Sequence, residues 1–220
     1  MYPPPREIWL VITHLGAASI MLPMLLMITA ELWLAERRSD LLAWTLAMTA
    51  GVGVVLASKI AFIGWGWGIP SLNFTGISGH TMLASSILPV WMGWLLAGPT
   101  RRFSLPGVLL GLAIGAVVGW SRLVLGAHSP SEVIAGWLLG MVISLIGYAL
   151  MRRPCPAQGW AKLAGMTLLL ALSPSISSYL PTHKWEVGLA LALSGHTHPH
   201  KRQDLHRPAP LMAAGPLQLE

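Results

Sequence analysis

Long apolar stretches separated by short polar connections run along most of the chain. Six of them reach the length of about 20 residues that a membrane-spanning helix needs, and they lie at 7–33, 41–65, 80–98, 104–125, 131–151 and 162–180. A shorter apolar run at 185–194 is too brief to span and is interpreted as an interfacial helix. The pattern predicts an all-α fold: a polytopic six-span transmembrane helical bundle forming one domain over residues 1–195.

Composition supports this interpretation. The chain has 220 residues, of which 54% are hydrophobic and only 10% are charged, whereas soluble domains carry about 25% charged residues. Lipids of the bilayer are therefore the expected surroundings. Residues 196–220 are polar and rich in Pro and His, and they are interpreted as a disordered tail.

The basic residues predict the orientation in the membrane. The loops after the first, third and fifth spans hold Arg37 and Arg38, Arg101 and Arg102, and Arg152, Arg153 and Lys162. Because Lys and Arg favour cytoplasmic loops, the loops around 66–79 and 126–130 are expected on the external face, most simply of a bacterial inner (cell) membrane. The net charge of +6 comes from these loops and the tail, so no nucleic-acid partner is expected.

Five ionisable residues cluster at the predicted external end of the bundle. Lys59 lies near the end of the second span, His80 opens the third, Arg122 closes the fourth, and His128 and Glu132 open the fifth. Ionisable residues in or beside spans are costly and mark functional sites by default. We therefore expect these five side chains to converge in one external-face site.

An anion site is predicted where the third span begins. A helix starting near Ser78 leaves the N–H groups from Gly79 onward unpaired, at the positive end of the helix dipole. Lys59 and Arg122 add two cations to the same layer, as a phosphate-binding pocket requires. The simpler alternative is that Ser78 is an ordinary N-cap.

Two histidines beside an anion site suggest phosphoryl transfer. One imidazole can attack phosphorus while the other protonates the leaving oxygen. Glu132 can hold the second ring nitrogen of a nucleophilic His128. Alternatively, Ser129 and Glu132 form a capping box with Pro130 at the first helical position, and the two interpretations are compatible.

These residues resemble the type-2 phosphatidic acid phosphatase superfamily, whose three motifs are K-x6-R-P, P-S-G-H and S-R-x5-H-x3-D. The chain has K-I-A-F-I-G-W from Lys59, I-S-G-H at 77–80 and S-R-L-V-L-G-A-H-S-P-S-E at 121–132. The order of the motifs and the spacing within the third agree, and the hydropathy pattern covers residues 7–180. The resemblance implies a membrane enzyme that hydrolyses a lipid phosphate or diphosphate monoester.

The resemblance also implies residue roles. His128 would be the nucleophile that forms a phosphohistidine, His80 the acid for the leaving group, and Glu132 the residue that orients His128. The phosphoryl oxygens would be held by Lys59, Ser78, Gly79 and Arg122. The family's phosphatases need no metal, so no cofactor is expected.

Three positions depart from the family pattern. Gly66 and Trp67 stand where the family has Arg-Pro, Ile77 replaces proline, and Glu132 replaces aspartate. The loss of the arginine removes one phosphate-binding cation. Gly66→Arg is therefore expected to raise turnover if the loop follows the family's path, and to fail if the Gly-rich run 64–68 has rebuilt it.

No other Lys or Arg lies between Lys59 and Arg101. Any substitute for the missing cation is therefore expected to be a neutral donor such as Asn73 or Thr75.

Two alternative functions remain. His80, His128 and Glu132 would offer a divalent-metal site, although Lys59 and Arg122 would repel the cation. The chain would otherwise be a non-catalytic protein that kept the fold.

A second S-G-H-T, at 194–197, has no long apolar helix after it and is not interpreted as a site. His196, His198 and His200 are interpreted as part of the solvated tail rather than as metal ligands.

Overall fold

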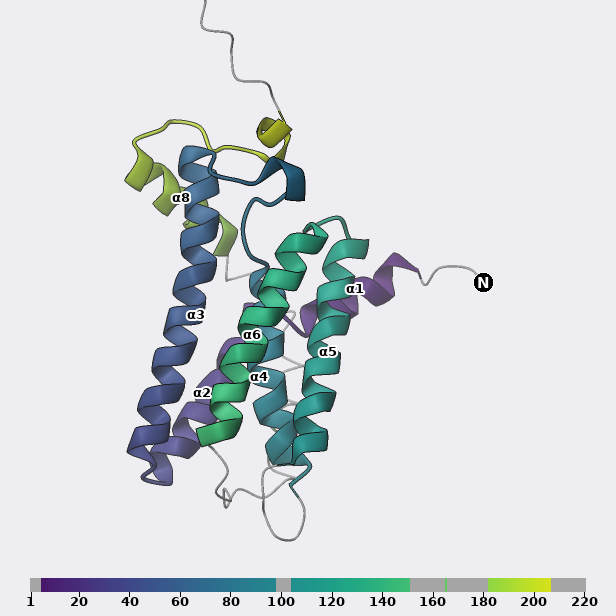
Figure 1. Ribbon diagram of the computed structural model, residues 1–220, viewed down its shortest axis with the longest axis vertical. Helices are drawn as coiled ribbons and strands as arrows, with labels where there is room; N and C mark the ends of the chain where they lie inside the picture. Colours follow the sequence, from purple (N-terminus) through teal and green to yellow (C-terminus); the bar gives the residue numbers. More distant parts are fainter. Residues whose placement is uncertain (1–4, 98–103, 151–164, 166–181, 207–220) are drawn as a thin grey trace, which may run out of the picture.

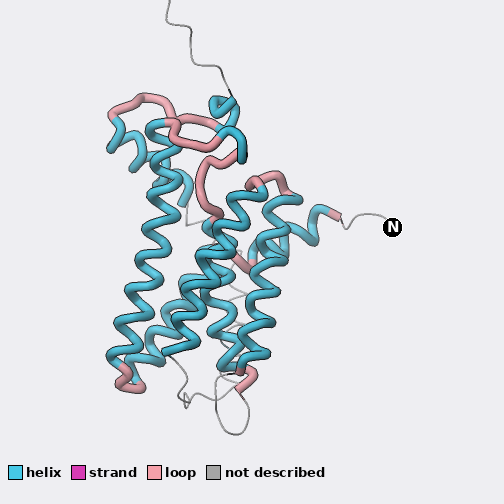
Figure 2. The backbone as a smooth tube through the Cα atoms, viewed as in Figure 1, coloured by secondary structure: helices cyan, strands magenta, loops and turns pink. Residues whose placement is uncertain are grey.

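The computed structural model describes residues 5–97, 104–150, 165 and 182–206, and helices make up most of them (Figures 1 and 2). The helices are α1 (Arg6–His14), α2 (Ala18–Leu34), α3 (Arg38–Trp65), α4 (Gly79–Leu95), α5 (Leu105–Val124), α6 (Pro130–Leu150) and α8 (Thr182–Ser194), with short 3-10 turns η1 (Pro70–Leu72) and η2 (Arg202–His206). The described residues contain no strand, only an isolated bridge between Ile69 and Phe74. The all-α prediction is confirmed.

Four helical stretches of the described residues are long and apolar enough to cross a membrane: Arg6–Leu34, Arg38–Trp65, Leu105–Val124 and Pro130–Ala149. The chain is thus a membrane protein. The predicted third span corresponds to α4, which has only 17 residues. The predicted sixth span, 162–180, lies outside the described residues except for residue 165. A count of six spans therefore stays a prediction.

The predicted first span, 7–33, is two helices rather than one. The chain turns at residues 15–17, and α1 packs on α5 while α2 packs on α3 and α4 (Figure 1). Gly16 lies in this break, and a Cβ atom there would come within 2.7 Å of Val118 Cγ1 and 2.9 Å of the His80 carbonyl oxygen. Close packing on α4 and α5 therefore determines where the span breaks, and hydropathy alone does not reveal such a contact.

α4 forms the centre of the bundle. Nearly all of its residues from Thr81 to Trp94 are buried, and its main neighbours are α5 and α6. Glycines four residues apart on α5 allow this packing, because a Cβ atom at Gly107 or Gly111 would collide with the backbone of α4, and one at Gly115 would lie 3.0 Å from Ser85 Cα. Small residues of this kind let helix backbones approach closely in membranes.

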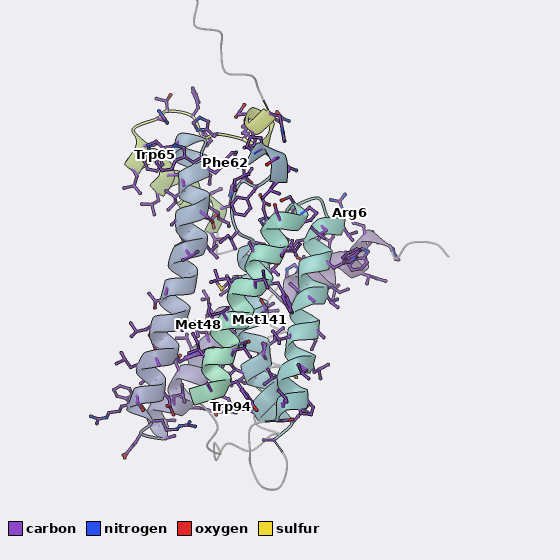
Figure 3. The ribbon with its side chains drawn as sticks, in the orientation of Figure 1. Arg6, Met48, Phe62, Trp65, Trp94 and Met141 are labelled. Atoms are coloured by element: carbon purple, nitrogen blue, oxygen red, sulfur yellow. The ribbon has the colours of Figure 1, made fainter. Side chains whose placement is uncertain are left out.

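The C-terminal segment, residues 195–206, lies on the end of α3. It passes over the loop between α3 and α4 after α8 has packed beside α3 (Figure 1). Phe62 and Trp65 mark this end of α3, and Trp94 lies at the opposite end of the bundle (Figure 3). Residues 196–206 of the predicted tail therefore lie against the bundle, whereas 207–220 lie outside the described residues.

Donors from the C-terminal segment satisfy the last carbonyls of α3. His196 Nδ1 lies 2.6 Å from the Gly64 oxygen, and the His200 N–H donates to the Ile63 oxygen at 3.0 Å. The final carbonyls of a helix have no partner within the helix, and they carry the negative end of its dipole. This need for donors explains why a polar, histidine-rich sequence is held against the bundle.

Candidate active site

One cavity of about 900 Å³ opens at the end of the bundle where α3 ends and α4 begins. Four of the predicted site residues line this cavity. They are Lys59 from α3, His80 from α4, Arg122 from α5 and His128 from the turn before α6. Gly79 lines it as well. Arg122, His128 and Lys59 are all close enough to His80 to interact with it electrostatically.

Helix topology brings these residues to one end. α3 stops at Gly66, whose φ of 72° and N–H bond to Phe62 at 2.8 Å close the helix. The chain returns through residues 67–78 to start α4, descends, and rises again in α5, which ends beside the start of α6 (Figure 2). Each of the predicted residues that line the cavity thus lies near a helix end, and these ends are at the same end of the bundle.

His128 is oriented by Glu132. Its Nδ1 lies 2.7 Å from Glu132 Oε2, and the histidine side chain is 15% exposed. A carboxylate accepts, so Nδ1 carries the proton and the neutral ring keeps its lone pair on Nε2. The N–H of Ser129 also donates to Glu132 Oε2, at 3.1 Å. The cap and the histidine contact therefore coexist, as the sequence suggested.

Glu132 is fully buried and surrounded by donors. Its Oε1 accepts from the N–H and the hydroxyl of Thr75, both at 2.7 Å. Arg202 donates from Nη2 to both carboxylate oxygens, at 2.9 and 2.7 Å. A buried charge is tolerated only when it is paired and hydrogen-bonded, and both conditions hold here.

Arg122 is held in place and retains an unused donor. Its Nη1 donates to the Thr13 hydroxyl on α1 at 2.9 Å. Its Nε is buried and has no hydrogen-bond partner within the part of the chain that the structure describes. An unpaired buried donor of a guanidinium beside a cavity is a suitable place for an anionic oxygen.

Lys59 has a partner that the sequence did not indicate. Its Nζ lies 2.7 Å from Glu186 Oε1 on α8, with side-chain exposures of 21% and 12%. Glu186 also lines the cavity. The sequence interpreted α8 only as an interfacial helix, and no motif in it marks this glutamate.

Ser78 was also predicted to bind phosphate but, unlike Lys59, Gly79 and Arg122, it does not line the cavity. It is fully buried, its hydroxyl lies 2.9 Å from that of Thr81, and its N–H donates to the Glu132 carbonyl at 3.1 Å. Neither Ser78 nor Glu132 lines the cavity. Ser78 is the N-cap residue of α4, although its side chain makes no capping hydrogen bond.

Arg202 was missed by the sequence analysis. Besides its bonds to Glu132, it donates from Nη1 to the Asn73 carbonyl at 2.7 Å and from Nη2 to the Thr75 hydroxyl at 3.1 Å. Arg202 thus brings a cation from the C-terminal segment to Glu132, whereas a neutral substitute for the missing phosphate-binding arginine stays a prediction. The pair Lys201-Arg202 was the available signal, and the polar composition around it concealed its role.

The other part of the cavity is apolar. Leu22 from α2, Val52 and Leu56 from α3, and Leu83 from α4 line it. Leu22 is 40% exposed. The cavity therefore joins a cationic end to an apolar side near the surface of the bundle.

Within the described residues, no group of three or more His, Cys, Asp or Glu side chains is arranged to hold a metal ion. The proposed triad of His80, His128 and Glu132 does not form such a group. Glu132 is instead saturated by His128, Thr75, Ser129 and Arg202.

Comparisons with known proteins agree with this geometry. The model of the PAP2 superfamily matches residues 62–154, which contain three of the four predicted ionisable residues that line the cavity, His80, Arg122 and His128. An uncharacterized 22.5 kDa protein in the cps region of Klebsiella pneumoniae is 37% identical over 211 residues, covering 91% of this chain and 99% of that protein.

A second relative is phosphatidylglycerophosphatase B of Bacillus subtilis (strain 168), which is 28% identical over 145 residues, covering 63% of this chain and 71% of that protein. No solved structure matches the chain significantly. The matched residues include His80, Arg122 and His128, which line the cavity, and the chain belongs to the PAP2 (type-2 phosphatidic acid phosphatase) superfamily.

Proposed function

We propose that this protein is an integral-membrane phosphatase that hydrolyses a lipid phosphate or diphosphate monoester through a phosphohistidine on His128. The observation that carries the proposal is the pairing of two features in one cavity. His128 is held by a buried carboxylate with Nε2 left as the basic nitrogen, and Arg122, whose Nε has no hydrogen-bond partner among the described residues, lines the same cavity.

In the first step, His128 Nε2 attacks phosphorus and the bond between phosphorus and the leaving oxygen breaks. His80 donates a proton to that oxygen, so the lipid alcohol or lipid phosphate leaves neutralised. In the second step, His80 accepts a proton from water, the water oxygen attacks the phosphohistidine, and inorganic phosphate is released. Glu132 stabilises the charge that His128 carries in between.

Arg122 and Lys59 would hold the equatorial phosphoryl oxygens, together with the N–H groups at the start of α4 from Gly79 onward. Ser78 would act indirectly and not by binding phosphate. Its buried N–H donates to the carbonyl of Glu132 and so connects the start of α4 to the start of α6. These groups need no metal ion for charge stabilisation.

The lipid nature of the substrate is supported by the cavity's shape. Its cationic end suits a phosphate group, and Leu22, Val52 and Leu56 offer apolar contacts to the start of a hydrocarbon chain. The relative named phosphatidylglycerophosphatase B acts on a lipid phosphate, by its name, which favours the same class here. The positive-inside pattern of the loops favours the external face for this end, and we propose a bacterial inner membrane as its location.

Purified protein in detergent tests the proposal. Phosphate release should be measured from phosphatidate, phosphatidylglycerophosphate, undecaprenyl diphosphate and lipid A phosphates, with and without a chelator. We expect turnover of at least one of them that survives the chelator. His128→Ala should abolish it, while His198→Ala, which changes an exposed histidine at the same end, should not.

Trapping the intermediate adds a second readout. Labelled substrate, quenched in alkali because phosphohistidine is acid-labile, should leave label on the wild-type protein and none on His128→Ala. Release that persists in His128→Ala would reject the mechanism. A wild-type protein that hydrolyses none of the substrates would instead favour a non-catalytic member of the family.

A further inference from the structure

We propose that Arg202 is a positioning residue for the nucleophile, which acts on His128 through Glu132 and makes the C-terminal segment part of the active site. The inference rests on the proposed function, since it assigns Arg202 a role in the same reaction. It adds a group from outside the three family motifs and outside the residues that the PAP2 model matches.

Arg202 lines the cavity, but its hydrogen bonds are made to the protein and above all to the carboxylate of Glu132. Nη2 binds both oxygens of Glu132, and Nη1 is occupied by the Asn73 carbonyl. Its side chain is 34% exposed, whereas Glu132 is fully buried. The guanidinium therefore closes the remaining side of a carboxylate whose other donors are Thr75, Ser129 and His128.

This closure restrains the histidine. Glu132 has three rotatable side-chain bonds, so its carboxylate needs several contacts to be held in one orientation. The N–H and hydroxyl of Thr75 fix Oε1, the N–H of Ser129 fixes Oε2, and Arg202 binds across both. Because Nη2 bridges the two oxygens while Nη1 is fixed by the Asn73 carbonyl, the planar guanidinium holds the carboxylate in one direction.

Arg202 also supplies the permanent positive charge next to Glu132. Without it, the buried carboxylate would have only neutral donors and His128. The carboxylate would then be free to rotate away or to take a proton, and either change would weaken its hold on Nδ1. Partners that orient the ligands of a metal ion typically contribute about 10- to 100-fold, and we expect an effect of the same order for Arg202.

The position of Arg202 depends on the contacts of the residues on both sides of it in the chain. His196 and His200 bind the last carbonyls of α3, and Leu205 packs near Gly68 and Phe62. These anchors lie on both sides of Arg202 in the chain. They explain how an arginine 70 residues away from Glu132 in sequence can hold a defined place beside it.

A double-mutant cycle tests the proposal. Turnover should be measured for wild type, Arg202→Gln, Glu132→Gln and the double variant. In the wild-type background, Arg202→Gln should lower kcat on the order of 10- to 100-fold and leave KM nearly unchanged. In the Glu132→Gln background the same change should cost less than about threefold, because its only route to His128 has been removed.

Two further variants separate position from charge. Arg202→Lys keeps the charge but loses the second anchor, the contact of Nη1 with the Asn73 carbonyl, so its kcat should lie between those of wild type and Arg202→Gln. Lys184→Gln removes a positive charge from an exposed site at the same end of the bundle and should change neither constant. A purely structural role would instead reduce the folded fraction equally in all backgrounds.

Equal losses of kcat in both backgrounds, or a loss confined to KM, would overturn the proposal. If wild type hydrolyses no lipid phosphate, the proposed function fails, and melting temperatures of the same four proteins then test the pairing. Non-additive changes in melting temperature at positions 202 and 132 would support the contact between Arg202 and Glu132. Additive changes would reject it.

Discussion

Replacing Gly66 by arginine tests whether this site lacks a cation or has been rebuilt. The family pattern has arginine at this position, and the sequence alone predicts that Gly66→Arg restores activity. The structure changes that expectation. Gly66 adopts a left-handed conformation with φ of 72°, and a Cβ atom there would lie 3.0 Å from His200 Cδ2 and 3.2 Å from its Nε2.

The magnitudes of the two effects decide the expected result. The left-handed conformation costs a residue other than glycine roughly 1–2 kcal/mol, and the anchored His200 ring must also shift. A donor that reaches phosphoryl oxygens is worth about 3–4 kcal/mol, on the order of 10²- to 10³-fold in kcat. A cation that again reached the phosphate would therefore raise kcat measurably despite the backbone strain. We expect no such gain, because the new side chain starts toward His200 and disturbs the segment that carries Arg202.

The assay is turnover of a lipid phosphate together with thermal unfolding in detergent. Gly66→Ala carries the same backbone strain without the charge, and Gly195→Ala carries left-handed strain at a position where a Cβ atom meets nothing within 4 Å. Both Gly66 variants should be less stable than Gly195→Ala, with turnover equal to or below wild type. A Gly66→Arg protein at least tenfold faster than Gly66→Ala would refute this reasoning.

Other changes give equally direct tests. Glu186→Gln frees Lys59 from its ion pair, so KM for an anionic substrate should fall severalfold; an unchanged KM would mean that Lys59 does not meet the phosphate. His80→Ala should lower the turnover of substrates with poor leaving groups much more than that of substrates with good ones, because only poor leaving groups need a proton. Equal losses across a series of leaving groups would mean that His80 is not the general acid. Gly111→Val should reduce the melting temperature strongly, since its side chain would collide with the backbone at Pro89, whereas an equally stable variant would show that the helices can separate there without penalty.

The arrangement of the motifs was predictable from the sequence because membrane topology constrains it. Helices that alternate in direction return their ends to the same face, so Lys59, His80, Arg122 and His128 were expected in one layer. They line one cavity. The contact between His128 and Glu132 followed from the capping box, since the cap that joins the Ser129 N–H to Glu132 places the carboxylate beside the preceding residue.

The contacts between distant segments were not predictable in this way. Glu186 meets Lys59 across 127 residues and Arg202 meets Glu132 across 70. Neither residue lies in a motif, and the polar composition around Arg202 is typical of a solvated tail. The break at Gly16 was missed for a related reason, because it depends on how closely Val118 and His80 approach.

The departures from the family pattern are connected in space. His200 covers the face of Gly66 from which the family's arginine would extend, and two residues later Arg202 reaches Glu132, which replaces the family's aspartate. The carboxylate of Glu132 contacts Thr75 and Arg202 while it holds His128. An arginine at position 66 would collide with the ring that anchors the C-terminal segment. The absence of that arginine, the longer acid and the docked segment are therefore mutually compatible, and reverting one of them without the others should weaken the site.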